Sequence, residues 1–287
     1  MTTKSIYKTP NGKQILLELY DKHLKNLNIQ FEDKYIKTRY GNTHLIITGN
    51  KDAIPLVCLH GGNSNTPDTL KSDLPLLEKF RLISIDIIGH PGKSGETQLS
   101  SKDLSYGYWL FDVIENLDLE NVNIYAGSFG AGIAIRLATV APDKINKLFL
   151  AVPSGIAKGS IKDQTKIMIP YLRYRIRSTE KNLIKMSSMI MTRFDDERIE
   201  LLQAIFKNVK IKTDMPRPAK KEELSSFTSP TAVLAAKNDI LFPAAKILPR
   251  AKEIFPNLVY TEILDGLHEP TLDEYKTIHQ KAFEFFL

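Results

Sequence analysis

Short apolar runs alternate along most of the chain with segments of helical periodicity, and this alternation constrains the fold more than any other feature. Two of the runs, at 54–59 and 82–88, are apolar at nearly every position. Strands with so few polar residues are expected where helices cover both faces of a parallel sheet. Strands that alternate with helices are connected by right-handed crossovers. The pattern therefore predicts a doubly wound α/β sheet.

The individual patterns predict a mostly parallel sheet of eight strands with helices on both faces. We expect strands at 30–38, 44–49, 55–60, 82–87, 123–127, 147–152, 232–236 and 259–264. Helical spacing predicts helices at 106–117, 129–140, 244–254 and 272–286, and an N-terminal helix at 10–27 that leans on the body. The turn Arg-Tyr-Gly-Asn at 39–42 predicts a hairpin, so the sheet should open with an antiparallel pair.

The strand pattern stops at residues 157–229, where the sequence is helical, rich in methionine and basic. This segment holds 16 of the 39 Lys and Arg residues but only 9 of the 33 Asp and Glu residues, so the excess positive charge of the chain lies here. An unstructured loop of this length is uncommon inside a compact domain, and an inserted helical lid is expected instead. The predicted organisation is a core of residues 1–156 and 230–287, in which 1–30 form a helical extension, and a lid at 157–229.

Cysteine content and hydropathy exclude several other classes of protein. The single cysteine, Cys58, rules out an intrachain disulfide framework and a cysteine-rich zinc or iron–sulfur site. The N-terminus lacks the apolar segment of a secretory signal, and no apolar run approaches the roughly 18–20 residues of a membrane span. We therefore expect a cytoplasmic protein without stable membrane insertion. Because the positive charge is confined to one segment, we expect no nucleic-acid partner.

One serine stands between a predicted strand and a predicted helix, in Ala-Gly-Ser-Phe-Gly at 126–130. This resembles a nucleophile elbow, in which a sharp turn exposes the serine at the carboxyl end of the sheet. Small residues two positions before and after the serine, here Ala126 and Gly130, keep the flanking chains from colliding. The alternative is a tight strand–helix turn that needs glycine only for packing. Ser128 is therefore the candidate nucleophile.

Two other glycine motifs do not fit the sequence. A dinucleotide-binding fingerprint needs Gly-x-Gly-x-x-Gly, whereas the glycines here stand at positions 127, 130 and 132. A phosphate-binding P-loop needs a further glycine that is separated from Gly-Lys-Ser by four residues, and Ile87 occupies that position ahead of Gly92.

A serine nucleophile needs a general base and an acid that orients this base, and the expected chain order is serine, acid, histidine. Asp239 follows the predicted strand 232–236, and His268 follows the last predicted strand. Both are therefore expected at the same edge of the sheet as Ser128. As alternatives, Asp239 or Asn238 could be a helix N-cap before residues 242–243, and His268 could be an ordinary surface histidine. The other five histidines fall in predicted helices, an early strand or other loops.

Two backbone N–H groups are candidates for the oxyanion hole that acyl transfer requires. Phe129 directly follows the candidate nucleophile, and Gly62 lies in His-Gly-Gly-Asn after the predicted strand 55–60. A glycine in that loop allows a backbone N–H to approach a ligand closely. His60 is expected to brace the loop rather than to act in the reaction.

Together these residues resemble the α/β-hydrolase superfamily from about residue 31 to 287. The resemblance rests on His-Gly-Gly at 60–62, Asp-Ile-Ile-Gly-His-Pro-Gly-Lys-Ser at 86–94, the serine elbow, Asp239 and His268. More narrowly, residues 38–46 followed by Asp-Ile-Ile-Gly resemble bacterial carboxylesterases that act on arylpropionate esters. That resemblance implies a lid between the sixth and seventh strands of the core. One departure is the extra residue Pro91, in a loop that borders the pocket in relatives.

The sequence thus predicts a serine hydrolase that cleaves carboxylic esters of small molecules through an acyl-enzyme. Catalysis would use Ser128, His268 and Asp239, and no metal or organic cofactor is expected. Hydrolysis of thioesters, lactones or carbon–carbon bonds, and perhydrolysis, remain alternatives for the same residues. So does a ligand receptor with a vestigial triad. The oligomeric state is not predicted.

The basic lid has two interpretations. In a helix, Arg173 and Arg177 share one face. They could attract carboxylated substrates or an anionic membrane surface. A solvated outer face of the lid is the alternative.

Overall fold

The computed structural model describes residues 4–287, and the eight strands of this range form a single sheet. The strands are β1 (Phe31–Thr38), β2 (Gly41–Thr48), β3 (Ile54–Leu59), β4 (Phe80–Ile85), β5 (Val122–Gly127), β6 (Ile145–Ala151), β7 (Thr231–Ala236) and β8 (Leu258–Leu264). Their order across the sheet is β1-β2-β4-β3-β5-β6-β7-β8. β2 pairs antiparallel with both neighbours, and all other neighbouring strands are parallel. The predicted eight-stranded, mostly parallel sheet is confirmed.

The first two strands form a hairpin with a tighter turn than the sequence suggested. Thr38 pairs with Gly41, so only Arg39 and Tyr40 lie in the turn. Gly41 adopts a φ of +129°, which glycine reaches without a steric penalty. The Thr38 hydroxyl donates a hydrogen bond of 2.7 Å to the Gly41 carbonyl oxygen. The second strand therefore begins at Gly41 rather than at the predicted residue 44.

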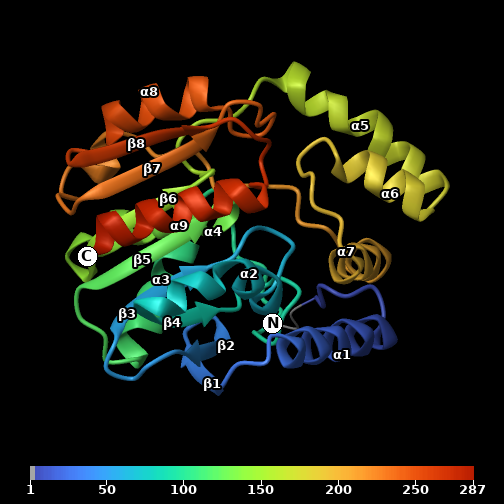
Figure 1. Ribbon diagram of the computed structural model, residues 1–287, viewed down its shortest axis with the longest axis horizontal. Coiled ribbons are helices and arrows are strands. Elements are labelled where there is room, and N and C mark those ends of the chain that lie inside the picture. Colours follow the sequence, from blue (N-terminus) through green and yellow to red (C-terminus); the bar gives the residue numbers. More distant parts are fainter. Residues whose placement is uncertain (1–3) are drawn as a thin grey trace.

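Helices cover both faces of the sheet, because each buries its apolar side against the strands (Figure 1). One face carries α3 (Ser105–Asn116), α4 (Ser128–Val140) and α8 (Ala244–Ile254). The other carries α2 (Thr66–Asp73), α9 (Leu272–Phe286) and part of α1 (Pro10–Asn26). The sequence patterns did not predict α2. It begins after Asn65, whose side chain accepts a hydrogen bond from the Asp68 amide.

Between β6 and β7 the chain leaves the sheet and forms further helices, which we call the helical insertion. They are α5 (Ile161–Ile176), α6 (Glu180–Ser187), α7 (Asp196–Asn208) and a short 3-10 helix at Glu222–Leu224. Figure 1 shows α5, α6 and α7 grouped together at one side of the sheet. They pack on one another through Tyr174, Leu183 and Phe206. The insertion falls within the predicted lid segment, residues 157–229.

The N-terminal part of the chain contacts both the core and the helical insertion. Tyr20 of α1 is buried in the core cluster that also contains residues of α2 and α9. Leu16 of the same helix packs against Ile205 of α7. Ahead of α1, Tyr7 forms an antiparallel bridge with Val209, just after α7. Two backbone hydrogen bonds of 2.7 and 2.8 Å flank this bridge, one donated by residue 8 to 208 and one by residue 210 to 6. The helix therefore leans on the insertion as well as on the body.

Candidate active site

Ser128 occupies the sharp turn between β5 and α4. Its φ is +46°, in the left-handed region that a residue other than glycine adopts only when its surroundings enforce it. Gly130 makes the turn possible, since a Cβ there would lie 2.6 Å from Leu59 Cβ and 2.7 Å from the Leu59 carbonyl oxygen. The Ser154 hydroxyl donates a hydrogen bond of 2.9 Å to the Ser128 carbonyl oxygen and so braces the turn. The local geometry is that of a nucleophile elbow.

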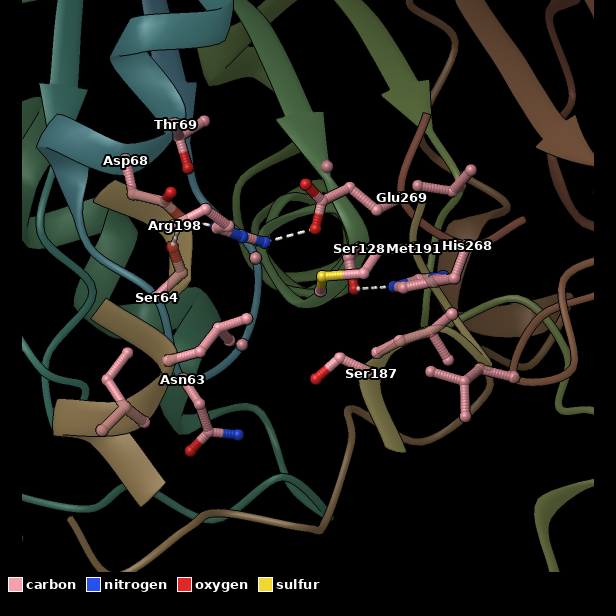
Figure 2. Close-up of a pocket in the computed structure, with 18 of the residues that line it drawn as sticks. Asn63, Ser64, Asp68, Thr69, Ser128, Ser187, Met191, Arg198, His268 and Glu269 are labelled. Carbon is pink, nitrogen blue, oxygen red and sulfur yellow. Dashed lines mark hydrogen bonds and ion pairs between the residues drawn. The ribbon is translucent and has the colours of Figure 1, made fainter. Parts of the chain in front are cut away.

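The three candidate side chains meet at one edge of the sheet. Ser128 Oγ lies 2.8 Å from His268 Nε2, and His268 Nδ1 lies 2.7 Å from Asp239 Oδ2. Figure 2 shows Ser128 and His268 pointing toward each other at the pocket. Both partners follow strands, as the sequence indicated: Asp239 comes after β7, and His268 comes after β8. The hydroxyl, the imidazole and the carboxylate thus form one continuous hydrogen-bonded chain.

Asp239 is not the N-cap of α8, which is Pro243, but it also binds the backbone of the turn ahead of that helix. Its second oxygen, Oδ1, accepts the backbone N–H groups of Leu241 at 2.7 Å and Phe242 at 3.0 Å. Oδ1 therefore binds the backbone, and these bonds fix the carboxylate so that Oδ2 faces His268. The carboxylate side chain is fully buried, which restricts it to this one orientation.

Charges within the chain shift the titration of both partners. Burial alone would lower the pKa of His268, but the Asp239 carboxylate outweighs burial and holds that pKa above its ordinary value. Burial alone would raise the pKa of Asp239, but His268 and the two backbone amides hold that pKa below its ordinary value. Asp239 is therefore ionised near neutral pH, and it stabilises a positive charge on the imidazole.

The loop after β3 lies directly against the elbow. A Cβ added at Gly61 would lie 3.7 Å from Ser128 Cβ, and one added at Gly62 would lie 3.4 Å from Phe129 Cβ. Both glycines line the pocket next to the candidate nucleophile. The backbone of this loop and the first turn of α4 therefore face the same space.

Two buried histidines hold this loop in place. His60 Nδ1 lies 2.7 Å from the Gly61 carbonyl oxygen, and His60 Nε2 accepts the backbone N–H of Ile87 at 2.9 Å. His90 Nδ1 accepts the backbone N–H of Asn63 at 2.9 Å. Burial lowers the pKa of both imidazoles, so both are neutral near pH 7. His60 makes the bracing contacts expected of it, whereas the part played by His90 was not predicted.

A cavity of about 490 Å³ opens in front of Ser128 and His268. The sheet side contributes the strand ends and the loop after β3, and the helical insertion contributes most of the apolar wall. The apolar residues from the insertion include Ile167, Met168, Met186, Met191, Leu202 and Phe206. The insertion therefore encloses the space in front of the candidate nucleophile.

A buried ion cluster joins the helical insertion to the core at the wall of this cavity. The Arg198 guanidinium, from α7, donates hydrogen bonds to Asp68 of α2 and to Glu269 (Figure 2). Burial alone would raise the pKa of Asp68, but Arg198 and the Ser64 hydroxyl hold it below its ordinary value. Glu269 directly follows His268, and its backbone N–H donates 2.7 Å to the carbonyl oxygen of Ile190 in the insertion. No pattern in the sequence predicted this cluster.

The loop at 86–94, which contains the extra Pro91, has an organising role in the structure. The buried Asp86 carboxylate lies 2.8 Å from His44 Nδ1 and accepts the backbone N–H groups of Thr66 and Lys93 at 3.0 Å. A Cβ at Gly92 would lie 2.7 Å from the Asp86 carboxyl carbon. Asp86 thus ties β2, the start of α2 and its own loop together, and none of the pocket-lining residues in the described range comes from 86–94.

The arginines singled out on the predicted lid helix lie outside the pocket. Arg173 and Arg177 are exposed, and neither is among the described residues that line the cavity. The cavity wall instead holds Arg193, Arg198 and Lys212. No sequence feature separates the arginines outside the pocket from the cations that line it, because all five are basic residues of the same segment.

Comparison with known proteins identifies the fold and the relatives. A family model described as alpha/beta hydrolase fold matches residues 54–182. A solved structure of naproxen esterase (carboxylesterase NP) from Bacillus subtilis superposes with a TM-score of 0.83, covering 98% of this chain and 100% of that one at 22% identity. The chain is therefore an α/β hydrolase by fold, as predicted.

Sequence relatives extend the likeness over nearly the whole chain. It is 24% identical over 288 aligned residues to "Uncharacterized carboxylesterase nap" of Bacillus subtilis (strain 168), covering 94% of this chain and 91% of that protein. It is 21% identical to "Carboxylesterase YbfK" of the same organism, covering 93% and 92%. The predicted resemblance to bacterial carboxylesterases is confirmed, and these relatives support a hydrolase of the carboxylic-ester class.

Proposed function

We propose that the protein hydrolyses carboxylic esters of small molecules, with Ser128 as nucleophile, His268 as general base and Asp239 as the residue that orients the imidazole. One observation carries this proposal. It is the unbroken hydrogen-bonded chain from Ser128 Oγ through both imidazole nitrogens to Asp239, at the wall of a cavity of about 490 Å³. A cavity of this size is within the range of small-molecule sites.

In the proposed reaction, His268 Nε2 takes the hydroxyl proton as Ser128 Oγ attacks the ester carbonyl carbon. The resulting tetrahedral oxyanion accepts hydrogen bonds from the backbone N–H groups of Gly62 and Phe129, whose chains meet beside the elbow. His268 then protonates the leaving alcohol, and the acyl-enzyme forms. A water molecule deprotonated by His268 attacks the acyl carbonyl, and the acid leaves as Ser128 regains its proton. Asp239 stabilises the imidazolium at both steps.

We propose neutral, largely apolar esters as the substrate class. All three basic groups that line the cavity have ionic partners close by: Arg198 contacts Asp68 and Glu269, and Lys212 Nζ lies 3.1 Å from Asp214. The third, Arg193, lies 3.6 Å from the Asp195 carboxylate and donates to the Ser72 hydroxyl at 3.0 Å. The positive charge is therefore largely compensated, and the apolar wall favours an apolar acyl or aryl group. The likeness to naproxen esterase is a reason to include arylpropionate esters among the test substrates.

We propose further that the helical insertion acts as a lid. It is inserted between the two parts of the core, residues 1–156 and 230–287. The insertion supplies Ile167, Met186 and Phe206 to the cavity wall. Methionine side chains adapt to differently shaped partners, so this wall can accept acyl groups of different shapes.

The test is turnover of p-nitrophenyl butyrate by the purified chain and by Ser128→Ala. We expect the substitution to lower kcat by several orders of magnitude, about 10⁴-fold or more, with an unchanged circular dichroism spectrum. Ser187→Ala is the matched control, because Ser187 lines the same cavity and should leave kcat nearly unchanged. Full activity in Ser128→Ala would overturn the proposal. Labelling of Ser128 by a fluorophosphonate without turnover of any ester would instead favour a receptor.

A further inference from the structure

The helix α5 of the insertion has one face that is occupied by the rest of the protein. Tyr174 is buried there, against Phe206 of α7 at a ring-centroid distance of 5.5 Å and against residues of α6. On the same side, Ile167 and Tyr171 contribute to the cavity wall. This face accounts for part of the apolar surface of the helix.

The opposite face of α5 is also apolar, and it is exposed to solvent. The exposed fractions are 51% for Met168, 69% for Ile169, 51% for Leu172 and 88% for Ile176. At about 100° per residue, these positions fall within roughly one quadrant of the helix, opposite Tyr174. A helix packed only on its own protein would carry polar residues there. A contiguous exposed apolar stripe of this kind marks an interaction surface.

Basic residues border this apolar stripe. Exposed cationic side chains in α5 and at its C-terminal cap are Lys162, Lys166, Arg173, Arg175 and Arg177. One acidic residue, Asp163, lies in the same stretch, and its carboxylate pairs with Lys166 at 2.7 Å. An apolar stripe flanked by lysine and arginine is the pattern of helices that lie in the interface of a membrane.

A lipid surface fits this face of α5 better than a second copy of the chain does. Apposing two copies of this helix would bring like charges together, whereas anionic headgroups complement them. In addition, Met168 belongs both to the exposed stripe and to the cavity wall, so the stripe continues into the pocket. Figure 1 shows α5 at the periphery, on the far side of the insertion from α1. None of the helices in the described range is long and apolar enough to cross a membrane.

We propose that the exposed face of α5 docks on an anionic lipid bilayer and turns the mouth of the cavity toward the membrane. Ile169, Leu172 and Ile176 enter the interfacial region, and Arg173 and Arg177 contact anionic headgroups. Delivery of membrane-dissolved esters to Ser128 rests on the function proposed above, whereas the docking itself does not.

The first test is co-sedimentation with vesicles of phosphatidylcholine alone or mixed with phosphatidylglycerol. We expect binding to the mixed vesicles only, weakening as salt is raised. The triple variant Ile169→Ser, Leu172→Ser, Ile176→Ser should lose about tenfold or more in affinity for the mixed vesicles, because the apolar contact is lost. Its control is Val259→Ser with Ile263→Ser, which removes side chains that are 54% and 56% exposed on β8. The control should bind as the unmodified chain does.

The second test separates charge from apolar contact. Arg173→Gln with Arg177→Gln should abolish the preference for phosphatidylglycerol, while Lys246→Gln with Lys252→Gln, two exposed positions in α8, should leave it intact. No binding to the mixed vesicles at low salt would overturn the proposal. An equal loss of binding in the α5 triple variant and in the β8 control would also overturn the proposal. A third contrary result would be light scattering that shows a dimer in the unmodified chain and a monomer in the triple variant.

Turnover of water-soluble p-nitrophenyl acetate distinguishes the two proposals. The substituted positions of α5 are not among the residues that line the cavity, so all these variants should turn over the ester normally. Vesicle binding without turnover in any form would refute the esterase and leave the docking intact. Turnover without vesicle binding would refute the docking and leave the proposed esterase activity intact.

Discussion

Replacing Arg198 by methionine should destabilise the protein strongly, because the guanidinium is the partner of two carboxylates. The side chains of Arg198, Asp68 and Glu269 are only 12%, 9% and 13% exposed, so water compensates little for a lost partner. Removal of one member of a buried ion pair costs about 3–5 kcal/mol, since the remaining charge stays buried and unpaired. We expect Arg198→Met to lower the free energy of unfolding in urea by about this amount.

Two further variants show whether unpaired charge causes the loss. Adding Asp68→Asn and Glu269→Gln to Arg198→Met should recover most of the stability, because the buried groups are then neutral. Glu200→Gln, also on α7, breaks an exposed ion pair with Lys22 and should cost less than about 1 kcal/mol. A loss below about 1 kcal/mol for Arg198→Met, or no recovery on neutralisation, would refute the reasoning.

The same variant has a readout in the pH dependence of ester turnover. Glu269 is one of the groups that raise the pKa of His268. Without Arg198 its negative charge is uncompensated, so the pKa of His268 should rise further. The acidic limb of kcat/KM should therefore move to higher pH in Arg198→Met and stay in place in Glu200→Gln.

Three other outcomes are expected. Asp239→Asn should lower kcat about 10⁴-fold in the p-nitrophenyl butyrate assay, because the imidazole loses its orienting charge; a loss of less than about tenfold would contradict this role. In the unmodified chain, kcat/KM should fall as pH decreases through the raised pKa of His268, with a midpoint above the ordinary value of 6.5, since only the neutral imidazole accepts the serine proton. Gly130→Ala should reduce the free energy of unfolding by about 1–3 kcal/mol, because its Cβ would lie 2.6 Å from Leu59 Cβ. Gly127→Ala, whose nearest contact would be 4.0 Å, should cost clearly less in the same urea titration.

The sheet and the three candidate side chains were predictable because each depends on local sequence. Runs such as 54–59 are apolar throughout, which is typical of strands covered on both faces, and residues 56–59 of this run are buried. Asp239 and His268 directly follow strands, and parallel strands end at a common edge. Because Asp239 and His268 directly follow strands of the predicted sheet, their place in the sequence was enough to predict their place at its edge.

The ion cluster was not predictable, because its members come from three distant parts of the sequence. Asp68 belongs to α2, a helix that is mostly polar and is defined by its Asn65 cap rather than by apolar periodicity. The register of α7 against the core decides whether Arg198 or another basic residue of the insertion reaches Asp68 and Glu269. That register depends on tertiary packing, which the alternation of strands and helices does not encode.

The bridge between Tyr7 and Val209 ties one of the helices above the cavity, α7, to the N-terminal part of the chain. α7 is fastened at its end by backbone hydrogen bonds to the residues ahead of α1, and α1 itself rests on the core. α5, by contrast, contacts chiefly α6. If the entrance of the cavity widens, we therefore expect α5 and α6 to be displaced while α7 stays in place. A substituent or fusion that disturbs residues 6–8 would loosen α7, although those residues lie far along the chain from Ser128, Asp239 and His268.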